Sequence, residues 1–197
     1  LVARSIHESG PWRDKPMVTV DCGALVPTLI ESELFGYVRG AFTGAVRNKQ
    51  WLLETADEGT LFLDEVAELP VELQSRLLRA IQEKEFRPVG STRRIPFHAR
   101  IIAATNRNLQ IAVQQGSFRK DLYFRLNVVS IQLPPLRDRK GDLPLLAEQL
   151  LRDLTAAQRG ERGKMHWTIS SEALDRLLAY SWPGNVRELR NVLERTL

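Results

Sequence analysis

The chain has 197 residues, of which 43% are hydrophobic and 26% charged, a composition typical of one globular domain with, at most, a small appendage. It excludes fibrous and wholly disordered proteins, and no run approaches the roughly 18 apolar residues of a membrane-spanning helix. Basic and acidic residues are interspersed and leave a formal net charge of +4, which is weak evidence for nucleic-acid binding. The single cysteine, Cys22, excludes an intramolecular disulfide and is typical of a reducing, cytoplasmic setting.

Strand and helix patterns alternate over the first part of the sequence. Apolar runs typical of buried strands occur at 17–20, 60–63 and 100–104. Apolar residues at helical spacing predict helices at 29–35 and 73–81, and residues 86–97 predict a hairpin inserted before the last strand. Because strands alternate with helices, the fold class is α/β, with a parallel sheet flanked by helices.

The composition changes at residues 133–142, where two prolines and five charged residues indicate a linker. Beyond it the apolar residues recur only at helical spacing. The last helix follows Pro183, and we expect Asn185 and Glu188 to form a capping box at its start. The sequence therefore predicts an α/β domain at residues 1–136 and a small helical domain at residues 137–197.

Polar side chains follow two of the predicted buried strands. Asp64 and Glu65 come directly after residues 60–63, and Asn106 closely follows residues 100–104. Ligands of open parallel sheets bind at the carboxyl ends of the strands, and two carboxylates there favour a cation such as Mg²⁺ bound to a nucleotide. Adjacent strand residues face opposite ways, so one carboxylate can hold the metal while the other orients water. The alternative is a solvated strand end, and the pair alone does not decide between them.

Two arginines lie close together in the sequence, at Arg119 and Arg125. On one helix their six-residue separation places them about 120° apart, so they predict different contacts. Taken alone, they are more typical of a solvated helix face than of a catalytic site.

Residues 40–45 place an aromatic residue between glycines, which allow unusual backbone angles. An exposed apolar tip there would favour partner contact. The local pattern, however, favours a buried turn with Phe42 in the core.

These segments, in this order, resemble the central domain of the bacterial enhancer-binding proteins, the AAA+ ATPase activators of sigma-54 RNA polymerase. The resemblance covers essentially the whole chain. It is carried by the following segments: 33–45, which contains the highly specific GAFTGA loop; 59–66, the Walker B strand; 104–106, the first sensor; 118–128, the arginine-finger segment; and 182–189, the second sensor.

The resemblance implies an AAA+ P-loop NTPase fold that binds ATP and Mg²⁺, with a role for each matching residue. Asp64 matches the Walker B aspartate that serves Mg²⁺, and Glu65 the glutamate that polarises the attacking water. Asn106 matches the residue that senses the γ-phosphate. Asp21 stands where many relatives carry the Asn partner of that glutamate, and we do not give it that role because two carboxylates would repel each other.

The resemblance also implies contacts between subunits and with a partner. Arg119 and Arg125 match arginines that reach the nucleotide of a neighbouring subunit, with Arg125 the preferred finger, and Arg187 matches the second-sensor arginine of its own subunit. The loop that engages sigma-54 matches Gly40, Ala41, Phe42, Thr43, Gly44 and Ala45, and residues 86–97 match a second pore-side loop.

The implied function is to couple ATP hydrolysis to remodelling of the closed promoter complex of sigma-54 RNA polymerase. The implied assembly is a homo-oligomeric ring, a hexamer, in the bacterial cytoplasm and without a membrane. The family's helix-turn-helix would follow Leu197, so we expect DNA contact only through a domain outside this sequence.

The Gly-rich phosphate loop of the family, GxxxxGK[ST], would lie immediately before Leu1. The only Gly-Lys pair, Gly163 and Lys164, lacks the first glycine and the following Ser or Thr of that motif. We therefore expect a truncated sequence and poor ATP binding by these 197 residues. Two alternatives stay open: a non-hydrolysing interaction module, and another AAA+ remodelling ATPase.

Overall fold

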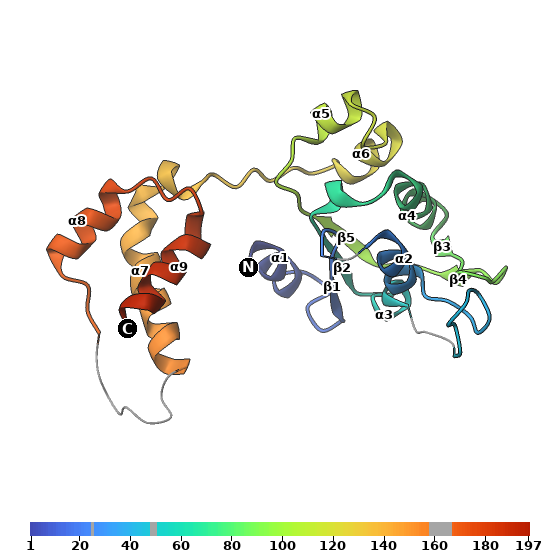
Figure 1. Ribbon diagram of the computed structural model, residues 1–197, viewed down its shortest axis with the longest axis horizontal. Coiled ribbons are helices and arrows are strands. Elements are labelled where there is room, and N and C mark those ends of the chain that lie inside the picture. Colours follow the sequence, from blue (N-terminus) through green and yellow to red (C-terminus); the bar gives the residue numbers. More distant parts are fainter. Residues whose placement is uncertain (25, 48–50, 158–166) are drawn as a thin grey trace. The chain divides into compact units, whose positions relative to one another are not determined.

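The computed structural model describes residues 1–24, 26–47, 51–157 and 167–197. It divides into two compact units, Leu1–Ser130 and Ile131–Leu197 (Figure 1), each with its own hydrophobic core. The Gly163 and Lys164 pair lies outside the described residues. Within the described ranges, no helix has the length and apolar character needed to cross a membrane.

The first unit is built on a parallel sheet of three strands, β1 (Met17–Asp21), β2 (Thr60–Asp64) and β5 (Arg100–Ala103), in the order β1-β2-β5. The middle strand is the most apolar, and Leu61 and Leu63 have no exposed surface. The register pairs Asp21 with Asp64, so that two carboxylates end neighbouring strands at the same edge. The predicted α/β class with a parallel sheet is confirmed.

Helices cover both faces of this sheet (Figure 1). The helices of the unit are α1 (Val2–Glu8), α2 (Pro27–Phe35), α3 (Leu52–Thr55), α4 (Val71–Glu83), α5 (Leu109–Gln114) and α6 (Lys120–Leu126), with a 3-10 turn, η1 (Val66–Glu68). α1 lies over the face that carries Met17, Thr19 and Phe62, whereas α2, α3 and α4 lie on the opposite face. In α4 the residues Leu73, Leu77 and Ile81 recur every four positions and are buried in the core, as their spacing predicts.

The predicted hairpin is present between α4 and β5. Its strands β3 (Glu85–Phe86) and β4 (Ile95–Pro96) pair antiparallel. The Phe86 ring packs edge-to-face against Phe97, with ring centroids 6.3 Å apart. This contact anchors the base of the hairpin in the core and leaves its tip free to lie at the surface.

The second unit is helical. It comprises two 3-10 turns, η2 (Leu136–Asp138) and η3 (Lys140–Asp142), and the helices α7 (Leu143–Ala157), α8 (Ser171–Ala179) and α9 (Asn185–Thr196). Leu136 has no exposed surface and packs in the core of this unit, although it was predicted to end the first domain. Trp182 closes the same core and donates from its indole nitrogen to the carbonyl of Leu177 at 2.7 Å.

The predicted capping box at the start of α9 is wrong for Asn185. The N-cap residue is Gly184, whose backbone N–H donates to the Glu188 carboxylate at 2.8 Å. The Asn185 side chain instead accepts the N–H of Leu136 at 2.8 Å. A contact between segments distant in sequence therefore outweighs the local capping pattern, and Asn185 fastens η2 to α9.

Candidate functional site

The carboxyl ends of β1 and β2 gather the side chains of Asp21, Asp64 and Glu65. Asp21 and Asp64 are register partners, and Glu65 follows directly. Glu65 has φ 52° and ψ 44°, in the left-handed region, a conformation that costs a non-glycine residue about 1–3 kcal/mol. Asp64 supports the turn, since its Oδ1 accepts the N–H of Glu65 at 3.1 Å.

Asn106 lies next to Glu65, as the strand order requires. The backbone N–H of Val66 donates to the carbonyl of Ala104 at 3.0 Å, which draws the end of β5 to the turn after β2. Asn106 Nδ2 then donates to Glu65 Oε1 at 3.2 Å. The other oxygen, Glu65 Oε2, is buried and has no hydrogen-bond partner among the described residues. Because a buried carboxylate oxygen without a partner is costly, this atom is suited to accept from a further donor.

Asp21 has a local role. Its Oδ1 accepts the N–H groups of Gly23 and Ala24, at 2.9 and 3.1 Å, in the loop after β1. This carboxylate therefore organises its own turn, and the structure gives it no hydrogen bond to Glu65. That geometry is compatible with leaving Asp21 out of the candidate catalytic set.

The carboxyl ends of β1 and β2 carry negative charge. Burial, followed by the carboxylates of Asp21, Asp64 and Glu65, raises the pKa of the Cys22 thiol to about 12. No group of three or more His, Cys, Asp or Glu side chains within the described ranges is arranged to hold a metal ion. Mg²⁺ does not require such a group, because it usually keeps several waters and binds one or two carboxylates together with phosphates. One carboxylate from Asp64 fits that chemistry.

The two arginines do not lie on one helix. Arg119 is the N-cap residue of α6, with φ −73° and ψ 133°, and Arg125 lies exposed in its last turn, so the predicted helical angle between them does not apply. Arg119 binds Asp121 through two hydrogen bonds, at 3.0 and 2.7 Å. The Arg119 guanidinium lowers the pKa of the Asp121 carboxyl, mainly through these bonds. Both side chains are exposed, so the pair adds little stability.

Arg187 belongs to the second unit. It is exposed in the first turn of α9.

The loop at residues 40–45 is a closed turn with an exposed tip. Gly40 N–H donates to the carbonyl of Ala45 at 2.9 Å, and both Gly40 and Gly44 have positive φ, at 84° and 105°. Phe42 is 47% exposed and packs edge-to-face on Tyr37, with ring centroids 4.9 Å apart. The prediction from the local pattern that Phe42 lies in the core is therefore wrong.

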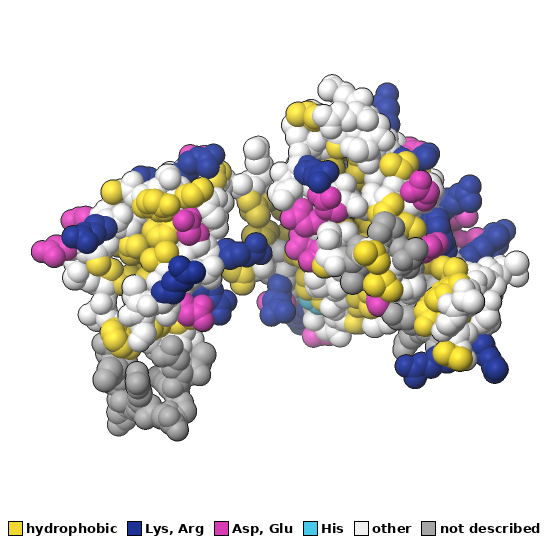
Figure 2. Space-filling model, viewed as in Figure 1, with side chains coloured by type: hydrophobic (Ala, Val, Ile, Leu, Met, Phe, Trp, Pro, Cys, Tyr) yellow, Lys and Arg dark blue, Asp and Glu magenta, His cyan; other side chains and the backbone are white. Residues whose placement is uncertain are grey.

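This loop and the hairpin form one surface, which we call the loop surface and define as residues 36–46 and 86–97. Val38 N–H donates to the carbonyl of Val89 at 3.2 Å, and Val89 N–H donates to the carbonyl of Gly36 at 3.0 Å. A Cβ built on Gly90 would lie 2.6 Å from the Cβ of Ala41. Figure 2 shows hydrophobic side chains at this end of the unit, bordered by basic ones.

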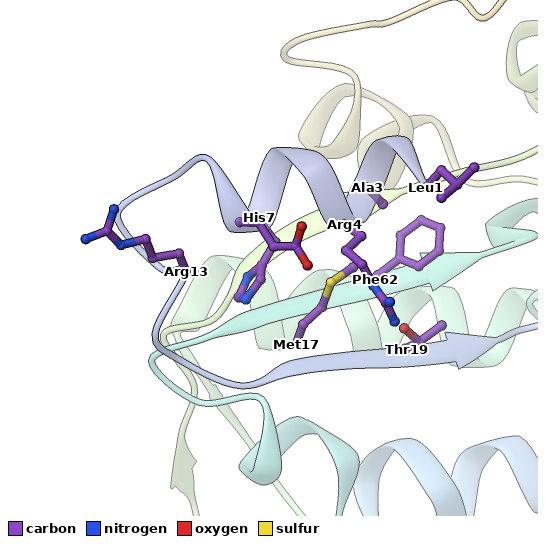
Figure 3. Close-up of a pocket in the computed structure, with 9 residues that line it drawn as sticks. Leu1, Ala3, Arg4, His7, Arg13, Met17, Thr19 and Phe62 are labelled. Atoms are coloured by element: carbon purple, nitrogen blue, oxygen red, sulfur yellow. The ribbon is translucent and has the colours of Figure 1, made fainter. Parts of the chain in front are cut away.

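A pocket of about 380 Å³ lies between α1 and the sheet (Figure 3). Thr19 and Phe62 form part of its floor, and Arg4 and His7 of α1 are among the residues above them. His7 is buried and its Nδ1 lies 2.9 Å from Thr60 Oγ1, which holds α1 to β2. No site was predicted at this pocket from the sequence.

The fold and these motifs match known protein families. Residues 1–132 match the Sigma-54 interaction domain, and residues 137–197 match the AAA+ ATPase lid domain. The chain belongs to the sigma-54 interaction domain family. Its α/β unit is therefore an AAA+ fold of this family, followed by the family's lid.

Curated and solved relatives agree with this assignment. The chain is 50% identical over 196 residues to the transcriptional regulatory protein GlrR of Escherichia coli (strain K12), covering 99% of the chain and 43% of GlrR. It is 49% identical over 197 residues to the DNA-binding transcriptional activator HyfR of the same organism, covering 100% of the chain and 29% of HyfR. The chain therefore spans less than half of the length of these two curated relatives.

Among solved structures, NtrX from Brucella abortus in complex with ATP superposes with a TM-score of 0.87 at 40% identity, covering 99% of this chain and 41% of NtrX. Hsp104 of S. cerevisiae, at 17% identity and a TM-score of 0.64, covers 98% of this chain and 37% of Hsp104 and shows the shared fold alone.

Within this sigma-54 interaction domain, sequence reasoning missed several contacts around the site. Arg107 forms an ion pair with Glu68 at 2.6 Å, which joins the loop after β5 to η1. Gln74 of α4 has no exposed surface and accepts the backbone N–H of Arg119 at 2.8 Å. The contact of Gln74 could have been expected from one sequence feature, a glutamine at a buried position of an apolar helix face.

Proposed function

We propose that this sigma-54 interaction domain is the ATPase centre of a sigma-54-dependent transcriptional regulator. It would couple ATP hydrolysis to remodelling of the closed promoter complex of sigma-54 RNA polymerase. The observation that carries the proposal is the edge at which Asn106 holds Glu65 and one buried oxygen of the Glu65 carboxylate has no hydrogen-bond partner among the described residues. The similarity to transcriptional activators and to NtrX in complex with ATP supports it.

The chemistry at the edge follows from the geometry of Glu65. Its Oε2 is suited to accept a hydrogen bond from a water and orient it against the γ-phosphate, while Oε1 is occupied by Asn106. Asn106 can change partner when the γ-phosphate leaves, and would report that change. Asp64 would hold Mg²⁺, which when bound to ATP neutralises charge on the phosphates.

Two sets of arginines would complete the nucleotide site. Arg125, and secondarily Arg119, would contact the nucleotide of a neighbouring subunit in a homo-oligomeric ring, which we propose to be a hexamer. Arginines supplied in this way contribute about 10³–10⁵ in rate to phosphoryl transfer. Arg187 would act on the nucleotide of its own subunit.

The loop at residues 40–45 would engage sigma-54. Phe42 and Thr43 lie at its exposed tip, and the glycines at each end provide the backbone freedom for the loop to move. The protein would act in the bacterial cytoplasm, and would contact DNA through a domain outside this sequence.

The substitution Glu65→Gln in the full-length protein tests the catalytic assignment. ATP hydrolysis should fall by about 10²–10⁴-fold, because an amide cannot take the proton of the attacking water, whereas ATP binding measured by fluorescence titration should persist. Glu72→Gln, at an exposed glutamate in the first turn of α4, is the matched control. Hydrolysis at the unsubstituted rate in Glu65→Gln would refute the assignment.

The substitution Thr43→Ala tests the partner assignment. It should abolish capture of sigma-54 and leave ATP hydrolysis unchanged, because Thr43 lies in the loop and not at the strand edge. Thr168→Ala, at an exposed threonine of the second unit, is the matched control. Transcription activation that survives Thr43→Ala would show that the loop is wrongly assigned.

Nucleotide titration of these 197 residues and of an N-terminally extended chain separates the ATPase from a non-hydrolysing interaction module.

A further inference from the structure

Arg76, in the middle of α4, makes contacts that no sequence pattern predicted. Its guanidinium forms an ion pair with Glu31 of α2 and lies over the ring of Phe35, 4.3 Å from the centroid. Its Nη2 also donates to the backbone carbonyl of Arg87 at 2.8 Å. The side chains of Arg76 and Glu31 are 31% and 33% exposed, so water screens the pair less than an ordinary surface pair.

These contacts lie at the bases of both halves of the loop surface. Phe35 is the last residue of α2 and directly precedes Gly36, whose carbonyl accepts the N–H of Val89. Arg87 lies two residues before Val89 in the hairpin. One guanidinium therefore binds the loop segment and the hairpin close to the point where they bind each other.

The opposite side of α4 is tied to the segment that carries Arg119. Gln74 Nε2 donates to the carbonyls of Leu69 and Ser117, at 2.7 and 3.0 Å, and its Oε1 accepts the N–H of Arg119. Gln74 and Arg76 are two positions apart, about 200° around the helix axis. A single rigid helix thus contacts the arginine segment on one side and the loop surface on the other.

We propose that Arg76 is a positioning residue that fixes the loop surface to α4, which Gln74 joins to the segment carrying Arg119. The planar guanidinium is required because its donors reach a carboxylate and a backbone carbonyl at once while its face stacks on an aromatic ring. A lysine can keep the ion pair with Glu31 but cannot reproduce all these contacts. The part of the inference that concerns sigma-54 rests on the proposed function.

Hydrogen exchange tests the anchoring directly and needs neither nucleotide nor partner. In Arg76→Met, the amides of Val38 and Val89 should exchange about tenfold faster, which corresponds to about 1.4 kcal/mol, while amides of β1 and β2 keep their rates. Arg76→Lys should recover part of the protection. Arg79→Met, at an exposed arginine of the same helix, is the matched control and should change nothing.

A second measurement separates this inference from the proposed function. Arg76→Met should weaken capture of sigma-54 by about tenfold and leave ATP hydrolysis at the unsubstituted rate, with Arg76→Lys intermediate in capture. Equal exchange of Val38 and Val89 in Arg76→Met and Arg79→Met would overturn the inference, whatever the capture assay shows. Faster exchange in Arg76→Met, in a protein whose unsubstituted form fails to bind sigma-54, would refute the proposed function alone and support the anchoring by Arg76.

Discussion

Replacing Gly90 with alanine should separate the two halves of the loop surface. Gly90 has φ 78°, where an alanine costs about 1–2 kcal/mol. The new Cβ would also lie 2.6 Å from the Cβ of Ala41, whereas apolar carbons prefer about 3.5–4.0 Å. One segment must therefore move by about 1 Å.

The free-energy cost of the clash with Ala41 is limited by the hydrogen bonds that the movement breaks. The loop can leave the hairpin by giving up the hydrogen bonds between Val38 and Val89 and between Val89 and Gly36. Each contributes about 0.5–1.5 kcal/mol net, so the steric part of the cost is about 1–3 kcal/mol. Together with the backbone strain, the whole change in the free energy of unfolding is then about 2–5 kcal/mol.

Gly116→Ala is the matched control, because it isolates the backbone strain. Gly116 has φ 74°, and a Cβ built there meets no atom of the described residues within 4 Å. Thermal unfolding of both variants should place Gly90→Ala at least about 2 °C below Gly116→Ala, since 1 kcal/mol shifts the midpoint by about 2–4 °C at this chain length. Hydrogen exchange at Val38 and Val89 should rise only in Gly90→Ala. Equal midpoints and equal exchange would refute the packing argument.

Two further outcomes follow from buried groups of the first unit. Gln74→Leu leaves the carbonyls of Leu69 and Ser117 without their side-chain donor. The free energy of unfolding, measured in urea, should therefore fall by about 2 kcal/mol or more. Unchanged stability would contradict this prediction. Folding raises the pKa of Cys22 from 9.0 to about 12, so the folded chain holds a proton that the unfolded chain releases, and stability should fall as the pH rises through that window. The Cys22→Ala variant should lack this decline, and identical pH profiles for both proteins would contradict it.

The sequence predicted the elements whose cause is local. The strands at residues 60–63 and 100–104 are apolar and partly β-branched, and they form because such runs suit a buried parallel sheet. Asp64, Glu65 and Asn106 could be grouped from the sequence alone, since parallel strands end at a common edge. For the loop at residues 40–45, the local pattern alone wrongly placed Phe42 in the core, whereas the motif predicts an exposed tip, which the structure has.

The sequence could not predict contacts whose partner is a backbone group far along the chain. Asn185 was expected to cap its own helix, but it binds the N–H of Leu136, 49 positions away. Arg76 is one of many arginines in the sequence, and its contacts with Glu31, the Phe35 ring and the carbonyl of Arg87 exist only in the folded chain. A backbone carbonyl has no residue identity, so no pattern of side chains records such a bond.

By itself, the sequence determined the parallel sheet, the order of its motifs and the family of the first unit, because hydrophobic periodicity and short motifs are properties of neighbouring residues. Tertiary structure decided the left-handed turn at Glu65, its hydrogen bond to Asn106 and the junction of the loop with the hairpin. The hydrogen bond and the junction join segments more than 40 positions apart, so they arise only when those segments are packed together. Their geometry then depends on which buried polar groups find partners, and this is settled by the whole fold.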